Sequence, residues 1–504
     1  MSLTLYSLAA FSGVVALFWC VVLPKRSRAA MLPPGPPGDP VIGNLRYMPT
    51  DQSAEVFHEW SKKYGDVMYL EVLGRRIVIL DTHQAAVDLL EKRSSNYSDR
   101  PVFTLYELLG WSPSLPFLQY GKQWSKHRQM HHTYLNRHKM DDFKTMQTQE
   151  ARTMVHNLMD CAPDKYDSYM GRFATGIISQ IVAGHRITSD DDWYLQASKM
   201  VSEAMTRTGP PGSSPIDFFP ALQYVPSWFP GAKHMGVVQK RRPTLRELHD
   251  YPVRTVREQK NLGNAKPSFI LAQLEEMGDE TDDYELKGAA ATMFGAGEST
   301  TWSTVAVFIL AMILYPEYQV KAQKEIDSVV GDLRLPGFED RANLPLVDAI
   351  LQEILRWNPP LGLPHRATED DIYRGMLIPK GSLIIANIKA MSLNESVYSQ
   401  PTSFYPERFL PKPVGNEEPP FINLAFGFGR RICTGRYLAE NSVWIAIATI
   451  LASCTISNAV DEHGEIIVPE NRMSDGLVSH PVDIRCVISP RSSTAKALIL
   501  EGSS

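Results

Sequence analysis

The sequence predicts a mainly helical fold with small β-sheets (α+β), preceded by one N-terminal transmembrane helix. Between about residues 143 and 318, most apolar residues recur at helical spacing. Residues 66–81 instead alternate β-branched residues around Gly74, which is typical of a hairpin, and residues 371–390 return to strand and turn character. The sequence shows neither an internal repeat nor a second linker, so we expect residues 41–504 to form one large domain.

The N-terminus predicts a membrane anchor. Residues 4–23 carry no formal charge and are long enough to span a bilayer as a helix. Lys25, Arg26 and Arg28 follow at once, which places the C-terminal side in the cytosol. A cleaved signal peptide would normally begin with its charges, so we favour an uncleaved anchor over residues 1–24.

A stiff segment and a helical body follow the anchor. Residues 25–40 are basic and proline-rich, and prolines at this density favour a polyproline II hinge. In the body, residues 286–314 read as one long apolar helix, and residues 317–330 and 346–357 continue the helical pattern. A last helix is expected over about residues 435–456.

Composition excludes several classes of protein. The net charge is −5, without the basic surplus that nucleic-acid binding requires. The five cysteines are scattered and never form a CxxC pair, which argues against a disulfide framework and a structural zinc site. A reducing compartment is therefore expected.

Cys433 lies in a glycine-flanked loop that could ligate a metal. A cysteine is most often a small buried hydrophobe. Here, however, loop N–H groups near the glycines and the start of the following helix could stabilise a thiolate. The loop reads FxxGxRxCxG, filled by Phe426, Gly429, Arg431, Cys433 and Gly435.

This loop resembles the haem-binding loop of the cytochrome P-450 superfamily. The resemblance implies that Cys433 is the axial thiolate ligand of the iron of haem b, where a thiolate favours O–O cleavage. It also implies the fold of that family for residues 41–504.

A second motif supports the resemblance. Glu353 and Arg356 are three residues apart on one helix face, where an ordinary exposed ion pair contributes only a few tenths of a kcal/mol. Residues 406–409 read Pro-Glu-Arg-Phe and resemble a segment of the same family. The resemblance implies that Arg408 joins Glu353 and Arg356 in a structural triad behind the haem loop.

The long helix carries a third motif, in which Gly295 and Gly297 precede Glu298, Ser299 and Thr300. Mid-helix glycines predict a close approach, and the hydroxyls could simply bond back to the helix. The stretch resembles the family's oxygen-activation motif, AGx(D/E)TT, which implies that Thr300 contacts bound dioxygen and helps deliver protons. Ser299 takes the acidic position and Glu298 comes one residue earlier, a rotation of roughly 100°. We expect Glu298 or Ser299 to take part in proton delivery.

Haem propionates need cationic or N–H partners when buried. The resemblance implies five such residues: Arg100, Trp124, Arg128, His365 and Arg431.

Four histidines lie on or near the same basic helix. We expect His127, His131, His132 and His138 at the surface, because no cysteine or acid is arranged with them as metal ligands. Alternatively, this basic face meets an acidic electron donor.

The sequence contains no dinucleotide-binding fingerprint and no flavin domain after the haem loop. The resemblance implies that electrons come from NADPH through a separate NADPH–cytochrome reductase, with cytochrome b5 as a second candidate donor. The expected location is the endoplasmic reticulum membrane, with the catalytic domain facing the cytosol.

The sequence thus indicates a haem-thiolate monooxygenase that inserts one oxygen atom of O2 into an apolar small molecule. Residues 364–371 and 373–375 look most like fungal members that oxidise secondary metabolites. One alternative is a haem enzyme of the same fold that catalyses rearrangement or dehydration without O2. Another is a non-catalytic haem-binding protein. Thr300 argues against both, and the anchor argues against the second.

Overall fold

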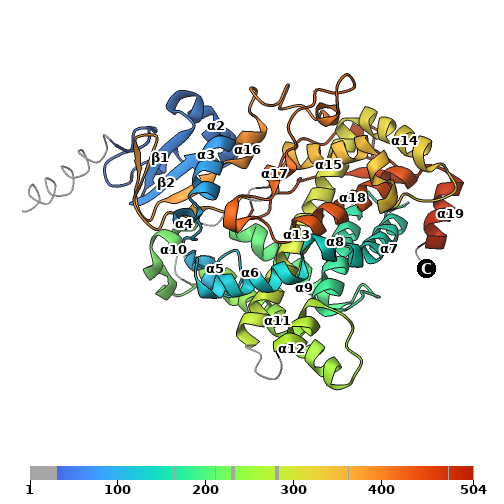
Figure 1. Cartoon of the computed structure of the whole chain (residues 1–504), viewed down its shortest axis with the longest axis horizontal. Coiled ribbons are helices and arrows are strands. Elements are labelled where there is room, and N and C mark those ends of the chain that lie inside the picture. Colours follow the sequence, from blue (N-terminus) through green and yellow to red (C-terminus); the bar gives the residue numbers. More distant parts are fainter. Residues whose placement is uncertain are drawn as a thin grey trace, which may run out of the picture. The chain divides into compact units, whose positions relative to one another are not determined.

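The computed structural model describes residues 31–502 apart from 160, 164, 210, 211, 229–232, 278–282, 361 and 475 (Figure 1). The anchor predicted over 1–24, and the start of the hinge, lie outside the described residues. The chain forms two compact units, one of residues up to Asp99 with Pro364–Asn387, the other of Arg100–Leu363 with Ile388–Ser504.

The first unit is built on a four-stranded sheet in the order β1-β2-β6-β3. β1 (Val67–Val72) pairs antiparallel with β2 (Arg75–Leu80), which confirms the hairpin predicted at this place. β2 runs parallel to β6 (Leu383–Ala386), and β6 runs antiparallel to β3 (His365–Arg366). A separate hairpin joins β4 (Asp371–Tyr373) to β5 (Met376–Ile378), as the strand and turn character predicted.

Helices flank this sheet. The buried carboxylate of Asp81, just after β2, accepts hydrogen bonds from His58 Nδ1 (2.7 Å), Ser61 Oγ (2.7 Å) and Asn387 Nδ2 (3.0 Å). These bonds fasten α2 to the sheet. The helical segments of the unit are η1 (Leu45–Tyr47), α2 (Ser53–Tyr64), α3 (His83–Ala86), η2 (Val87–Lys92) and α4 (Ser94–Tyr97).

The core of the second unit is α13 (Asp283–Leu314), the long helix predicted from its apolar run. Among the described residues it is the one helix long and apolar enough to cross a membrane, with a mean hydropathy of 1.4. However, 78% of that stretch is buried, so α13 is a core helix. It packs against α6 (Lys122–Tyr134), α8 (Tyr166–Ala183), α11 (Lys233–Asn261) and α18 (Arg436–Ser453).

The helix predicted over residues 435–456 ends early. α18 stops at Ser453, and the chain continues directly as β7 (Cys454–Val460). The pairing of Ile456 with Ile488 in β9 explains the difference, since both side chains are buried. The three-stranded sheet has the order β8-β7-β9, with β8 at Ile466–Ile467 and β9 at Cys486–Pro490.

The predicted helices at residues 317–330 and 346–357 are confirmed as α14 and α15. The remaining helical segments are α5 (Thr104–Leu109), η3 (Arg137–Lys139), α7 (Asp141–Leu158), α9 (Trp193–Thr208), α10 (Pro215–Phe218), η4 (Pro220–Tyr224), α12 (Phe269–Met277), α14 (Pro316–Val330), η6 (Phe338–Asn343), α15 (Pro345–Trp357), α16 (Ile388–Ser392), η7 (Pro406–Phe409), α17 (Ile422–Ala425), η8 (Gly429–Arg431) and α19 (Ser493–Gly502).

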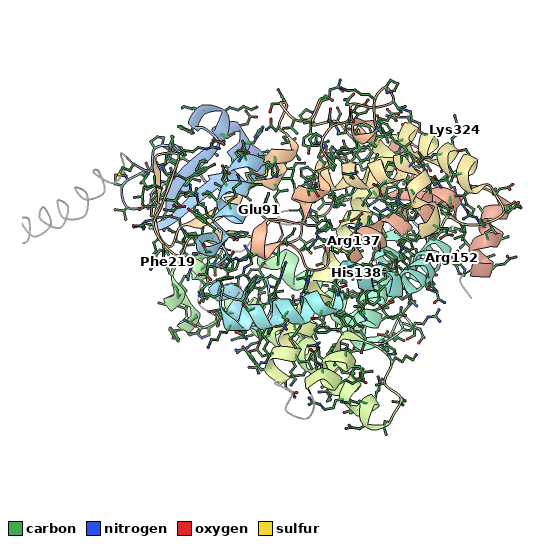
Figure 2. All side chains as sticks on the ribbon, viewed as in Figure 1. Glu91, Arg137, His138, Arg152, Phe219 and Lys324 are labelled. Carbon is green, nitrogen blue, oxygen red and sulfur yellow. The ribbon has the colours of Figure 1, made fainter. Side chains whose placement is uncertain are left out.

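The last helix, α19, packs against α7 and α18, and Arg152 of α7 lies beside Gly502 (Figure 2). Just before α19, Arg491 forms a bidentate ion pair with Asp327 of α14, at 2.6 and 2.9 Å. The backbone N–H of Arg491 also donates to Ser453 O at the end of α18 (2.9 Å). Arg491 therefore connects α14 and the end of α18 to α19.

Candidate functional site

Cys433 sits at the end of a closed loop. Gly427 and Gly429 adopt positive φ angles of 79° and 53°, which glycine reaches without strain. These turns bring the chain back so that the N–H of Cys433 donates to Phe426 O (2.9 Å). α18 begins three residues later at Arg436, so the thiol lies near a helix N-terminus.

The surroundings of Cys433 act on the pKa of its thiol in two opposite directions. The residue keeps an exposed surface, yet surrounding atoms are dense enough for burial to raise the pKa of the thiol. The Gly435 N–H and the guanidinium groups of Arg128 and Arg436 act in the opposite direction and lower this pKa. The expected role of Gly435 as a donor is therefore present in the structure. Arg436 had no place in the motif.

Arg100 and Arg431, two of the residues expected to bind the haem propionates, hold the loop segment of residues 115–118. Arg100 donates to Pro116 O (3.1 Å) and to Leu363 O (2.9 Å). Arg431 donates to Leu118 O (2.8 Å) and more weakly to Leu115 O (3.3 Å). Residues 115–118 are thus held from two sides by guanidinium groups. The Arg431 guanidinium also lies 5.0 Å from the ring centre of Trp124, so these two candidates are in contact.

Arg128 is a half-buried cation next to the cysteine loop. It donates to the carbonyl of Ile432, directly before Cys433. Burial lowers the pKa of Arg128, and the nearby Cys433 raises it. A partly desolvated guanidinium in this position favours an anion beside it.

His365 lies in β3 of the other compact unit. It is buried, and its Nδ1 donates to Tyr97 O at 2.7 Å. Because a carbonyl only accepts, Nδ1 carries a proton.

Glu353, Arg356 and Arg408 form one buried cluster. Glu353 accepts from Arg356 at 2.7 and 2.8 Å and from Arg408 at 3.1 and 3.2 Å. All three side chains have an exposed fraction of 0%. The N–H of Tyr405 also donates to Glu353 (2.8 Å). The Glu353–Arg356 pair on α15 is therefore not an ordinary surface ion pair, because it is buried. Through its bonds to Tyr405 and Arg408, Glu353 also holds η7 against α15.

Ala296 and Thr300 lie on a face of α13 that is not fully buried, which we call the open face. Ala296 is exposed and Thr300 is half-buried, one turn apart, and Thr300 Oγ1 donates to Ala296 O (2.8 Å). Ser299 is buried and donates to Gly295 O (2.8 Å). Both hydroxyls therefore bond back to the helix. At Gly297 the predicted close approach is to α8, because a Cβ there would lie 2.7 Å from Ile178.

The structure does not bring Glu298 to the face of Thr300. Glu298 is 3% exposed and faces Ser198 of α9 and Asp167 of α8. Burial raises the pKa of Glu298 to about 7, with a smaller upward effect from Asp167, while a hydrogen bond with Ser198 lowers it. Its Oε2 has no hydrogen-bond partner among the described residues. Sequence reasoning missed Ser198 and Asp167, because no pattern links α8 and α9 to the motif.

The prediction of surface histidines was wrong for His127 and His131. Both are buried where α6 packs on α13, with His127 Nε2 at 2.5 Å from Glu285 Oε2 and His131 Nε2 at 2.9 Å from Ala289 O. Burial lowers the pKa of His131 to about 4. Their spacing of four residues, in phase with Trp124, was the signal for a shared buried face.

The other two histidines, His132 and His138, are exposed. His138 lies beside Arg137 in η3 (Figure 2). Among the described residues, no group of three His, Cys, Asp or Glu side chains could hold a metal ion.

The described residues fit a haem. A single cysteine with an exposed surface lies near a helix N-terminus, and the half-buried cation Arg128 lies beside it. Arg100 and Arg431 add further positive charge around residues 115–118, which suits two propionates.

The comparisons with known proteins agree with this geometry. The family model of cytochrome P450 matches residues 33–486. The chain belongs to the cytochrome P450 family. A cytochrome P450 monooxygenase of Postia placenta is 38% identical over 96% of both chains, and one of Armillaria gallica is 36% identical over 97% of both.

A solved zebrafish cytochrome P450, determined with abiraterone, has the same fold. It matches with a TM-score of 0.70 at 23% identity, covering 87% of this chain and 100% of that one. The chain is thus a cytochrome P450 monooxygenase, an oxidoreductase whose family implies a haem cofactor and a small-molecule substrate. Redox partner proteins are general in this family.

Proposed function

We propose that this cytochrome P450 is a haem-thiolate monooxygenase of the endoplasmic reticulum membrane. It inserts one oxygen atom of O2 into an apolar small molecule in secondary metabolism. Residues 1–24 form the anchor, 25–40 the hinge and 41–504 the haem domain, which faces the cytosol. The apolar run before Lys25 and the basic residues after it support this layout.

One observation carries the proposal: the closed loop that leaves Cys433 with an exposed surface near the N-terminus of α18. Cys433 would hold the haem iron as a thiolate, and the Gly435 N–H, Arg128 and Arg436 favour that ionised form. The carbonyl oxygen of Phe426 accepts the hydrogen bond from the Cys433 N–H that closes the loop, and Gly429 adopts the positive φ angle that the turn requires. When bound, the haem supplies the binding of dioxygen and the transfer of its oxygen atom.

The propionates would be held by Arg100, Trp124, Arg128, Arg431 and His365. The bonds of Arg100 and Arg431 to backbone carbonyls keep both guanidinium groups in place before a propionate arrives. Preorganised donors of this kind lose little entropy on binding. Glu353, Arg356 and Arg408 act on folding and haem retention rather than on the reaction.

Thr300 manages protons at the open face of α13. Its hydroxyl proton points at Ala296 O, so the lone pairs of Oγ1 can accept a hydrogen bond from the open side. Glu298 acts indirectly, as a nearby proton reservoir behind the helix, which the pKa of about 7 supports. Ser299 keeps its hydroxyl on Gly295 O and shapes the helix at this point.

The electrons come from NADPH through a separate NADPH–cytochrome reductase, with cytochrome b5 as a second donor. The lack of a flavin or dinucleotide-binding segment in the sequence supports an external source. The fungal monooxygenases among the relatives support the role in secondary metabolism. The resemblance of residues 364–371 to fungal members of the family supports it as well.

Microsomes from cells that express the chain test the proposal. The reduced protein should show the thiolate-type absorbance shift with CO, and Cys433→Ser should lose it. With reductase and NADPH, product formed under labelled O2 should contain one labelled oxygen atom. Retention of the CO shift by Cys433→Ser would identify a different ligand, and turnover without NADPH would exclude the reductase. Release of the chain by alkaline carbonate would exclude the anchor.

A further inference from the structure

His131 is a buried histidine that contacts the residue next to Cys433. Its side chain is 1% exposed, between α6 and α13. On one side of the ring, Nε2 lies 2.9 Å from Ala289 O of α13. On the other side, Nδ1 lies 3.4 Å from Oγ1 of Thr434, which directly follows Cys433 in the chain. His131 belongs neither to the motif of the cysteine loop nor to that of α13, yet it connects the two.

The contact with Ala289 determines which ring nitrogen of His131 carries a proton. A carbonyl oxygen only accepts hydrogen bonds, so Nε2 donates. Burial lowers the pKa of His131 to about 4, so the ring is neutral near pH 7. A neutral imidazole has a single N–H, which leaves Nδ1 as an acceptor. The hydroxyl of Thr434 is therefore the donor in its contact with His131.

Packing keeps the His131 ring in this orientation. The ring of Phe269, at the start of α12, lies edge-to-face against the imidazole, with ring centres 5.7 Å apart. A half-turn of the imidazole would place carbon atoms where the two nitrogens now lie, and both hydrogen bonds would be lost. A buried Ala289 carbonyl left without this donor would be costly, so the observed orientation is favoured.

One face of α6 contacts the residues on both sides of Cys433. Arg128, three residues before His131 and thus on the same face, donates to the carbonyl of Ile432. His131 accepts from Thr434 on the other side. The two contacts differ, because a carbonyl is fixed by the backbone whereas a hydroxyl rotates to suit its surroundings. The direction of the Thr434 proton therefore depends on the acceptor that His131 offers.

We propose that His131 is a positioning residue for the haem ligand: it draws the hydroxyl proton of Thr434 toward α6 and so keeps that proton away from the Cys433 sulfur. The inference rests on the proposed role of Cys433 as the axial thiolate. A hydrogen bond donated to a ligating sulfur withdraws electron density from it, and this raises the reduction potential of the metal. By holding the proton elsewhere, His131 keeps the thiolate electron-rich.

The reduction potential of the full-length holoenzyme, together with the wavelength of its CO band, tests this role. His131→Gln keeps a donor near the position of Nε2 but has no acceptor at the position of Nδ1. Its potential should rise, and its CO band should move to shorter wavelength. His131→Asn keeps an acceptor near the position of Nδ1 and should restore both values. His132→Gln, at the neighbouring exposed histidine, is the matched control and should change neither.

Thr434→Val separates positioning of the proton from general loosening of the loop. Valine keeps the β-branched shape and removes the hydroxyl. In this background, His131→Gln should no longer change the potential, since no hydroxyl proton remains to be redirected. An equal rise in both backgrounds would show a merely structural role of His131 and would overturn the proposal.

Thr434→Val alone gives a second reading, which holds even if His131→Gln fails to fold, because Thr434 is only half-buried. Its potential should equal that of the wild type. A lower potential would show that the hydroxyl already acts on the sulfur, and would also overturn the proposal. The CO band of Cys433→Ser reads the ligand separately. A band that persists there refutes Cys433 as the ligand, whereas a band that is lost there but insensitive to His131→Gln refutes the positioning role alone.

Discussion

Glu298 and Thr300 are two residues apart on α13, yet their side chains lie on opposite sides of the helix. Thr300 shares the open face with Ala296, whereas Glu298 is buried against α8 and α9 with one oxygen unpartnered. Ser299 occupies the acidic position of the motif, and the acid one residue earlier, Glu298, is separated from Thr300 by the helix itself.

Thr300→Ala should uncouple the reaction. The change removes Oγ1, the hydroxyl that donates to Ala296 O and that we propose holds a proton. Product formation should fall by about 10²-fold, the lower end of what a positioned proton-transfer group contributes, while peroxide release rises. Product and peroxide are measured per NADPH consumed. Thr301→Ala, at the neighbouring buried position, is the control and should stay coupled.

Glu298→Gln should change how stability depends on pH. The carboxyl has an ordinary pKa of 4.5 in the unfolded chain and about 7 in the folded one, so the folded state holds its proton longer. The free energy of unfolding therefore falls as the pH rises from about 4.5 through about 7, and it falls no further above that range once the carboxyl is ionised in both states. Gln removes this cost, so the variant should be more stable than the wild type by up to about 3 kcal/mol at pH 8.

The same variant should gain nothing near pH 4.5, where both side chains are neutral. Thermal denaturation at both pH values measures the difference. Glu462→Gln, at a side chain that is 87% exposed, is the control and should show no pH-dependent gain. A constant offset at both pH values would show that folding does not raise the pKa of this carboxyl.

Glu353→Gln should destabilise the haem domain. Arg356 and Arg408 are both fully buried and would lose their shared carboxylate. Arg408 keeps its ion pair with Glu418 (2.9 Å), whereas Arg356 loses its ion-pair partner, and a buried cation left in that state costs about 3–5 kcal/mol. Haem content and the thermal midpoint should fall together. Glu407→Gln, in the same segment, breaks a partly exposed pair with Lys321 and should cost less than about 1 kcal/mol.

Arg491→Ala should loosen the C-terminal end of the chain, beyond the residues that the family model matches. The change removes the bidentate pair with Asp327, which is half exposed, and weak contacts to the last carbonyls of α18. A loss of about 1–2 kcal/mol is expected for charge-assisted bonds at this exposure. Thermal denaturation measures it against Arg472→Ala, whose pair with Asp483 is largely exposed. Equal midpoints would show that Arg491 adds nothing.

Sequence reasoning reached those parts of the structure in which short motifs fix local geometry. The Cys433 loop and the α15 pair could be located because glycine turns and helical spacing act within a few residues. The failures depend on tertiary packing. His127 and His131 are buried because α6 packs against α13. The helix α18 ends at Ser453 because the residues after it pair with β9. Likewise, nothing near Glu298 in the sequence names Ser198 as its neighbour.

The guanidinium contacts around residues 115–118 have a consequence for synthesis of the chain. Arg431 reaches Leu118 across 313 residues, and Arg128 reaches Ile432 across 304. Neither contact can form on the ribosome until the C-terminal part has emerged, and loops of this length close late. The nascent chain therefore carries Arg128 without its partners for most of translation. The hydrogen bonds of Arg128 and Arg431 are thus completed only as synthesis ends, and under the proposed function these residues could hold a haem only from that stage onward.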